Sequence, residues 1–127
     1  MSLRDTLAPV IREMLDRNDA SQSTLRGGAF CAAFERKVDG EPWVQAKSGV
    51  LNIFYPSDEL PLPQVQSRLP RLPLDSKCVA WEPWKYATFE FDPIGADDLT
   101  NLIQDLFVQF YGFPNDIELD SEVFVMR

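Results

Sequence analysis

AFCAAFERKVDGEPWVQAKSGVLNIFYP, residues 29–56, carries the clearest structural signal in the chain, a β-hairpin that turns at residues 38–40. A two-residue loop would set apolar side chains opposite polar ones on each face of the hairpin. A three-residue loop, with Gly40 in the left-handed conformation, instead pairs Phe34 with Val44. Because the burial pattern fixes strand register, we expect the three-residue loop.

The second half of this hairpin ends in VLNIFY (50–55), which is apolar on both faces except at Asn52. Such a pattern is typical of strands in the middle of a sheet that are covered on both sides. We therefore expect this end of the strand to be central and covered from both sides.

A further strand is predicted over residues 78–91, interrupted at Pro83, and it contains the aromatic stretch WEPWKYATFEF. Period-two alternation places Ala87, Phe89 and Phe91 on one face, which we expect to meet the helices. Trp84 and Tyr86 share the opposite face. Trp81 lies beyond the proline and is assigned to neither face.

Two amphipathic helices are predicted, one before these strands in the sequence and one after them. The first covers residues 3–17, with Ser2 as its N-cap. Pro9 conflicts with a helix interior, so this helix either begins near Thr6 or kinks. The second covers residues 95–112 and carries a broad apolar face at helical spacing.

The connection between the hairpin and the aromatic strand is rich in proline. YPSDELPLPQVQSRLPRLPLDSK (55–77) holds half of the chain's ten prolines, interleaved with leucines. We predict a largely extended connection over about 56–76, with one helical turn at PQVQSRL and with its leucines docked on the body of the domain. A proline-rich ligand for a recognition module is the alternative.

The tail IELDSEVFVMR (117–127) alternates and should add the last strand. The order α-β-β-connection-β-α-β then predicts a single α+β domain over residues 1–127. Its expected form is a two-layer sandwich of a roughly four-stranded, mainly antiparallel sheet with both helices on one face. The other face is left uncovered unless a partner or the proline-rich connection covers it.

The residue types exclude much catalytic chemistry. The chain has no histidine, so it lacks Ser-His-Asp and Cys-His arrangements and histidine metal ligands. Cys31 and Cys78 form no motif, and we expect both to be reduced. The acids at residues 116–122 are not accompanied by the glycine and asparagine residues of the usual calcium loop. They fit better the solvated edge of a sheet. We therefore predict no metal, no cofactor and no enzymatic activity.

The net charge of −8 is concentrated near the C-terminus. Residues 1–85 hold eleven acidic and eleven basic side chains, whereas residues 86–127 hold nine acids and one arginine. The favoured interpretation is a solvated surface that keeps the protein in solution. The alternative is a negative face that attracts a basic partner. Nucleic-acid binding is disfavoured, because it requires clustered lysine and arginine.

Two resemblances to known families follow from these elements. WKYATFEF, then a helix, then NDIELDSEVFVM resembles the second half of gyrase-inhibitor-like effector-binding domains. The glycine usual before the tyrosine is Lys85 or Trp84 here, and the leading strand of the first half is missing. This resemblance implies a small-molecule cleft lined by Trp84, Tyr86 and an acid such as Glu122. The small size, acidity and helix-strands-helix order also resemble bacterial type III secretion chaperones, which are dimeric.

Two functions from different classes remain open. The first is a protein-binding module, chaperone-, adaptor- or inhibitor-like, that uses the aromatic sheet face or the acidic C-terminal third to bind another protein or a second copy. The second is a small-molecule domain whose aromatic side chains line a pocket for an apolar ligand. The candidate binding residues are Trp43, Trp81, Trp84, Tyr86 and Glu122. A cytoplasmic location without membrane contact is expected, because no apolar run approaches the roughly 20 residues that cross a bilayer.

Overall fold

The computed structural model describes residues 2–21 and 23–125. Within these ranges there are three α-helices, α1 (Leu3–Ala20), α2 (Pro61–Arg68) and α3 (Ala96–Asp105), and a short π-helix, η1 (Leu106–Phe110), continues from α3. The strands are β1 (Phe30–Arg36), β2 (Trp43–Lys47), β3 (Val50–Phe54), β4 (Lys77–Glu82), β5 (Tyr86–Glu90) and β6 (Leu119–Val125).

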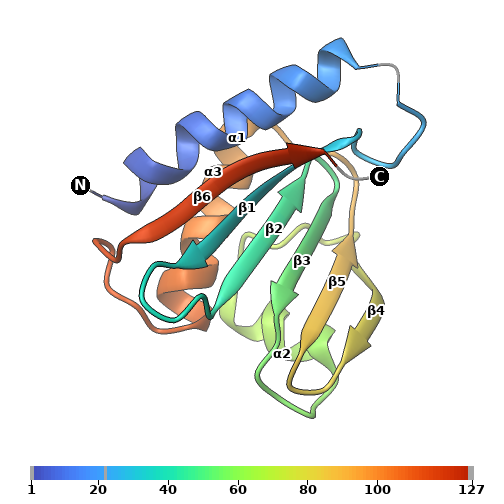
Figure 1. Cartoon of the computed structure of the whole chain (residues 1–127). Coiled ribbons are helices and arrows are strands. Elements are labelled where there is room, and N and C mark those ends of the chain that lie inside the picture. The colour runs from blue at the N-terminus through green and yellow to red at the C-terminus, as the bar shows by residue number, and fades with distance from the viewer. Residues whose placement is uncertain (1, 22, 126–127) are drawn as a thin grey trace.

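The six strands form one open sheet in the order β4-β5-β3-β2-β1-β6, and every neighbouring pair is antiparallel (Figure 1). In Figure 1 the sheet lies in front of α3, and α1 runs beside β6. The predicted α+β class is confirmed. The predicted four strands and two helices are wrong in number, because two expected strands are each divided by a turn and the proline-rich connection contains α2.

The hairpin between β1 and β2 has the predicted register. Phe34 pairs with Val44 across the two strands. Gly40 has a φ of 72°, the left-handed conformation that the three-residue loop requires. The alternation of buried and solvent-facing side chains therefore fixed this pairing correctly.

The first unexpected turn, at Ser48 and Gly49, divides the expected second strand of the hairpin into β2 and β3. β3 is central, as predicted, because it lies between β5 and β2. The prediction that β3 is covered on both sides is wrong. Leu51 and Ile53 are fully buried on one face, whereas Val50, Asn52 and Phe54 are only half-buried on the other.

Gly49 is required at this turn by a close approach of the backbone. A Cβ atom there would lie 2.6 Å from the carbonyl oxygen of Phe91, which follows β5. We expect Gly49→Ala to lower the free energy of unfolding by about 1–3 kcal/mol, the usual cost of overpacking. Urea denaturation measures this change. Ser48→Ala is the matched control in the same turn, and equal stability of the two variants would contradict the expectation.

The second unexpected turn, at Pro83 and Trp84, divides the aromatic stretch into β4 and β5. The predicted division of the faces holds within β5: Ala87 and Phe89 are fully buried, and Tyr86 is half-buried on the opposite face. The prediction of one interrupted strand is wrong, because the chain reverses direction at this turn.

The core lies between the sheet and the helices α1 and α3. Helix α1 begins at the predicted cap, where Ser2 and Asp5 form a capping box. Pro9 lies inside this helix without ending it, so the predicted start near Thr6 is wrong. The helices contribute fully buried apolar side chains at helical spacing, namely Leu3, Leu7, Ile11 and Met14 from α1 and Leu99, Leu102 and Ile103 from α3.

The proline-rich connection is more ordered than predicted, because α2 occupies eight of its residues. Proline is compatible with the first turn of a helix, and Pro61 begins this one. Leu69 and Leu72 are buried as expected. Leu60 and Leu74 contradict the expectation of docked leucines, because they are 67% and 99% exposed.

The long helix predicted over 95–112 changes its hydrogen-bonding pattern at Leu106. The amide of Tyr111 donates to the carbonyl of Leu106, five residues earlier, which is the π-helical spacing. The hydroxyl of Tyr111 donates to the carbonyl oxygen of Phe54 at the end of β3. This bond anchors the end of the helical segment to the sheet.

Tyr111 should make the free energy of unfolding fall as the pH rises above about 10. Burial raises the pKa of its phenol well above the usual value of 10.0. Above pH 10 the unfolded chain loses this proton while the folded chain keeps it, so the free energy of unfolding falls by about 1.4 kcal/mol per pH unit. Denaturant titrations between pH 9 and 11.5 should show a shallower fall for Tyr111→Phe than for the wild type. An identical pH slope in both proteins would contradict this assignment.

The last predicted strand is present as β6, and residues 126–127 of that prediction lie outside the described residues. β6 forms one edge of the sheet and pairs along its length with β1. Within residues 2–21 and 23–125, the helices are all too short or too polar to span a bilayer.

Candidate functional site

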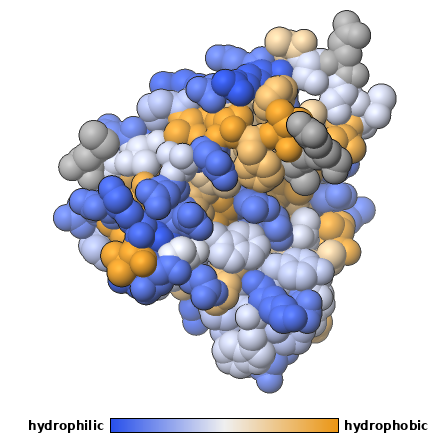
Figure 2. Space-filling view, in the orientation of Figure 1, coloured by the Kyte–Doolittle hydropathy of each residue, from blue (hydrophilic) through white to orange (hydrophobic). Residues whose placement is uncertain are grey.

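The face of the sheet opposite the helices, which we call the open face, is uncovered by any described element. It is the face viewed in Figure 1, and Figure 2 shows that its surface mixes polar and apolar side chains. The proline-rich connection does not cover it, because α2 contributes Pro61 and Val65 to the helix-side core. The uncovered face that the sequence left open is therefore present in the described structure.

A row of polar side chains crosses the middle of the open face. The hydroxyl of Thr88 donates to Oδ1 of Asn52 over 2.9 Å, and Nδ2 of Asn52 donates to Oε1 of Gln45 over 3.3 Å. These bonds link β5, β3 and β2. They leave the amide nitrogen of Gln45 without a partner in the part of the chain that the structure describes, so it can donate to an incoming carbonyl group.

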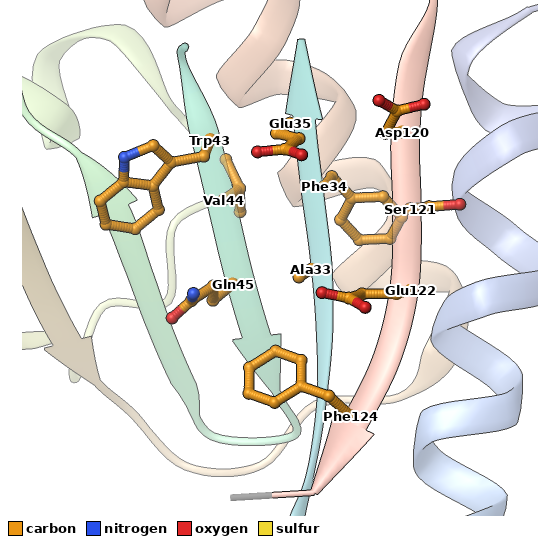
Figure 3. Close-up of a pocket in the computed structure, with 10 residues that line it drawn as sticks. All are labelled: Ala33, Phe34, Glu35, Trp43, Val44, Gln45, Asp120, Ser121, Glu122 and Phe124. Atoms are coloured by element: carbon orange, nitrogen blue, oxygen red, sulfur yellow. The ribbon is translucent and has the colours of Figure 1, made fainter. Parts of the chain in front are cut away.

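A hollow of about 640 Å³ lies on this face over β2, β1 and β6. Figure 3 shows Trp43 and Phe124 at opposite ends of this hollow, with Glu35 across from Trp43 on the neighbouring strand and Glu122 near Phe124 on β6. Asp120 lines the same hollow beside Glu35. We call these five residues the acid-aromatic hollow.

The carboxylates of the hollow have no counter-charge in the described structure. Glu35 and Asp120 are directly paired in the register of β1 and β6, and like charges in such positions destabilise a sheet. Glu122 lies opposite Ala33, one step along the same face. None of the three carboxylates forms an ion pair with another described residue.

Two cations near these acids in sequence are engaged elsewhere, whereas Lys37, two residues after Glu35, is exposed and forms no ion pair with a described residue. Arg36 pairs with Asp39 at 3.2 Å, and its guanidinium lies over the ring of Phe113. The buried Lys47 donates to the carbonyl oxygens of Arg26 and Gly28. The lining of the hollow itself holds three acids and no basic residue, so its charge is negative.

A second depression, of about 450 Å³, adjoins the hollow and shares Trp43 with it. Its other aromatic walls come from β3, β5 and the turn between β4 and β5. We call its four aromatic residues, Trp43, Phe54, Trp84 and Tyr86, the aromatic shelf.

The turn that carries Trp84 is strained. Its φ is 63°, and the amide of Lys85 donates to the carbonyl of Glu82 to close the turn. With Pro83 before it, Trp84 occupies the position of a type II turn that normally requires glycine. A left-handed conformation costs a non-glycine residue about 1–2 kcal/mol. Trp84 is nevertheless 62% exposed, so its side chain recovers little of this cost by burial.

The five predicted site residues do not form one cluster. Trp43, Trp84 and Tyr86 lie together on the shelf, and Glu122 lies in the hollow. Trp81 lies on the helix side of β4, where its ring packs edge-on against Tyr55 with the ring centroids 6.0 Å apart. Trp81 is thus separated from the open face by the sheet.

The cleft implied by the effector-binding resemblance is not formed from Trp84, Tyr86 and Glu122. β5 and β6 are separated by β3, β2 and β1. At about 4.8 Å per strand, Glu122 is on the order of 19 Å from Tyr86.

Sequence reasoning missed Glu35, Phe54, Asp120 and Phe124. Glu35 could have been found, because the predicted hairpin register pairs it with Trp43 on one face. Asp120 and Phe124 could not, because their place depends on β6 pairing with β1 from the far end of the chain.

The remaining reactive groups give little chemistry. Both cysteines are free thiols, as predicted. Burial raises the pKa of the Cys31 thiol to about 11, so it stays protonated at neutral pH. Within the described residues, no three acids or cysteines are arranged to hold a metal ion.

Comparison with protein-family models, with curated proteins and with solved structures finds no match.

Proposed function

We propose that the protein is a non-enzymatic binding domain that recognises another protein, in the manner of a chaperone, adaptor or inhibitor, through its open face. The observation that carries this proposal is the uncovered face itself, on which the aromatic shelf adjoins uncompensated carboxylates. Tryptophan and tyrosine are enriched among interface residues that dominate binding energy.

Two features of this face support the proposal because they cost folding stability. One is the like-charge pair of Glu35 and Asp120, and the other is the left-handed Trp84. Local strain and unfavourable pairs persist most often where function requires them. The protonated Cys31 and the lack of histidine support the absence of catalysis. Free thiols also suit the proposed cytoplasmic location.

Selection of peptides from a random library displayed on phage tests this function. Selected peptides should lose binding to Trp43→Ala and keep it to Leu74→Ser, which removes an exposed apolar side chain outside the shelf and hollow. Peptides that bind both variants equally, or a library that yields none, would refute the use of the open face.

A small-molecule function is the second candidate, and the volume of the hollow favours it. Ligand pockets usually measure about 300–1,000 Å³, and the hollow measures about 640 Å³. Under this alternative, apolar or cationic compounds would quench tryptophan fluorescence in a monomer at micromolar concentration. Selected peptides would then fail to bind at the same face.

A further inference from the structure

We infer that the partner docks as an extended basic segment, with an arginine side chain in the acid-aromatic hollow and an apolar side chain on the aromatic shelf. This inference rests on the proposed function and specifies the chemistry of the partner. It follows from the charge of the hollow, from the shape of its walls and from the distance between the hollow and the shelf.

Charge complementarity selects a cation. The three carboxylates of the hollow have no ion-pair partner among the described residues, and the register holds Glu35 and Asp120 side by side. Directly opposite residues of an antiparallel pair have Cβ atoms about 5 Å apart. A bound cation would convert this repulsive pair into an attractive contact. A metal ion is a poorer occupant, because no three described ligands are arranged to coordinate one.

The walls of the hollow select arginine over lysine. Trp43 lies across from Glu35 in the register of β1 and β2, and Phe124 lies near Glu122 on the same face of β6 (Figure 3). A guanidinium group is planar, stacks on aromatic rings and donates to two carboxylates in fixed directions. A lysine ammonium offers a point charge and cannot stack in this way.

The spacing of the two depressions selects an extended segment. The shelf is centred near β3 and the hollow near β1, which are separated only by β2. Two strand spacings amount to about 10 Å, and an extended chain rises about 3.3 Å per residue. Because side chains of an extended chain alternate between its two faces, the apolar and arginine side chains should be two or four residues apart. The unpaired amide nitrogen of Gln45 lies along this path and can donate to a backbone carbonyl of the segment.

A second copy of the chain fits this face less well. A two-fold symmetric dimer presents the same patch on both subunits. It would place Glu35, Asp120 and Glu122 of one copy against the same acids of the other, in a chain whose net charge is already −8. We therefore expect the open face to be free in solution.

A synthetic nine-residue peptide tests the inference. It carries two leucine–arginine pairs, with each arginine two residues after its leucine, so that both side chains lie on one face of the extended peptide. The other positions are serine and glycine, and the affinity is measured by isothermal titration calorimetry at 150 mM salt. We expect the triple variant Glu35→Gln, Asp120→Asn, Glu122→Gln to bind at least tenfold more weakly than the wild type. Replacing the arginines of the peptide by lysine should weaken binding several-fold, and replacing them by glutamate should abolish it.

A matched control separates a specific site from general attraction to an acidic protein. Asp16→Asn, Asp19→Asn, Asp58→Asn removes the same charge from exposed carboxylates outside the shelf and hollow. This control should change affinity less than threefold. An equal loss of affinity in both triple variants would overturn the inference.

The outcomes also separate this inference from the proposed function. If selected peptides are neutral and lose binding on Trp43→Ala but not on carboxylate neutralisation, the inference fails and protein binding stands. If the wild type sediments as a dimer that the open-face triple variant alters, the occupant is a second copy and the inference fails. If no peptide binds the open face, both fail.

Discussion

Trp84→Gly should leave the protein as stable as the wild type, or more stable by up to about 1 kcal/mol, while it weakens peptide binding at least tenfold. Glycine removes the cost of about 1–2 kcal/mol that a left-handed non-glycine residue imposes. Glycine also gives the unfolded chain more conformational freedom, which offsets roughly 0.5–1 kcal/mol of this gain in stability. The lost indole is 62% exposed, so few core contacts disappear with it.

Thermal unfolding and peptide titration on the same protein preparation measure both effects. Trp84→Asn is a useful companion, because asparagine tolerates the left-handed conformation and also removes the indole. Both variants should fold and bind weakly. A lower unfolding temperature in both variants would instead identify Trp84 as a residue that holds the turn and the sheet together, and intact binding would remove it from the shelf.

Phe89→Ala should have the opposite effect, a fall of about 3–5 kcal/mol in the free energy of unfolding. Phe89 is fully buried in β5, opposite Leu51 of β3 and Cys78 of β4. Removal of its ring leaves a cavity between the sheet and the helices. Because a domain of this kind is stable by only about 5–15 kcal/mol, this single loss takes a large share of the total.

Thr88→Ala is the control for Phe89→Ala, because Thr88 precedes Phe89 and lies on the open face. It loses one hydrogen bond to Asn52 and should cost about 0.5–1.5 kcal/mol. Urea denaturation compares the two variants. Costs of the same size would contradict the assignment of one face of β5 to the core and the other to solvent.

The contrast between Phe89 and Trp84 shows what sequence could predict. The alternation of apolar and polar residues identified the buried side of β5 and the register of the first hairpin, because both depend on which side chains are buried away from water. These inferences needed only neighbouring residues. The uncovered face followed from the same pattern and the placement of both amphipathic helices on one side.

The turns and the helix in the connection were hidden by misleading local patterns. The aromatic stretch reads as one strand because a tryptophan occupies the turn position where glycine is expected. The tight turn at Gly49 lies between two apolar runs that read as a continuation of one strand. In α2, prolines occupy the first turn, where they are tolerated, and conceal the helical segment that follows.

The hollow required information that no local pattern contains. Trp43 was selected as an aromatic candidate and Glu122 as an acidic one, but nothing in the sequence placed them beside each other. β6 brings Asp120, Glu122 and Phe124 to β1 by pairing between opposite ends of the chain. The acids of β6 read as a solvated edge, and they do lie on an edge strand. The role in a binding surface that we propose for them rests on their position beside β1, in the same hollow as Trp43.

The indole N–H resonances of the three tryptophans test the central claim most directly. In ¹⁵N-labelled protein titrated with the leucine–arginine peptide, we predict that the signals of Trp43 and Trp84 shift in a saturable manner. Trp81, on the helix side of the sheet, should not move and serves as the internal control. Shifts at Trp81 with unchanged signals from Trp43 and Trp84 would place binding on the other side of the sheet and contradict the account.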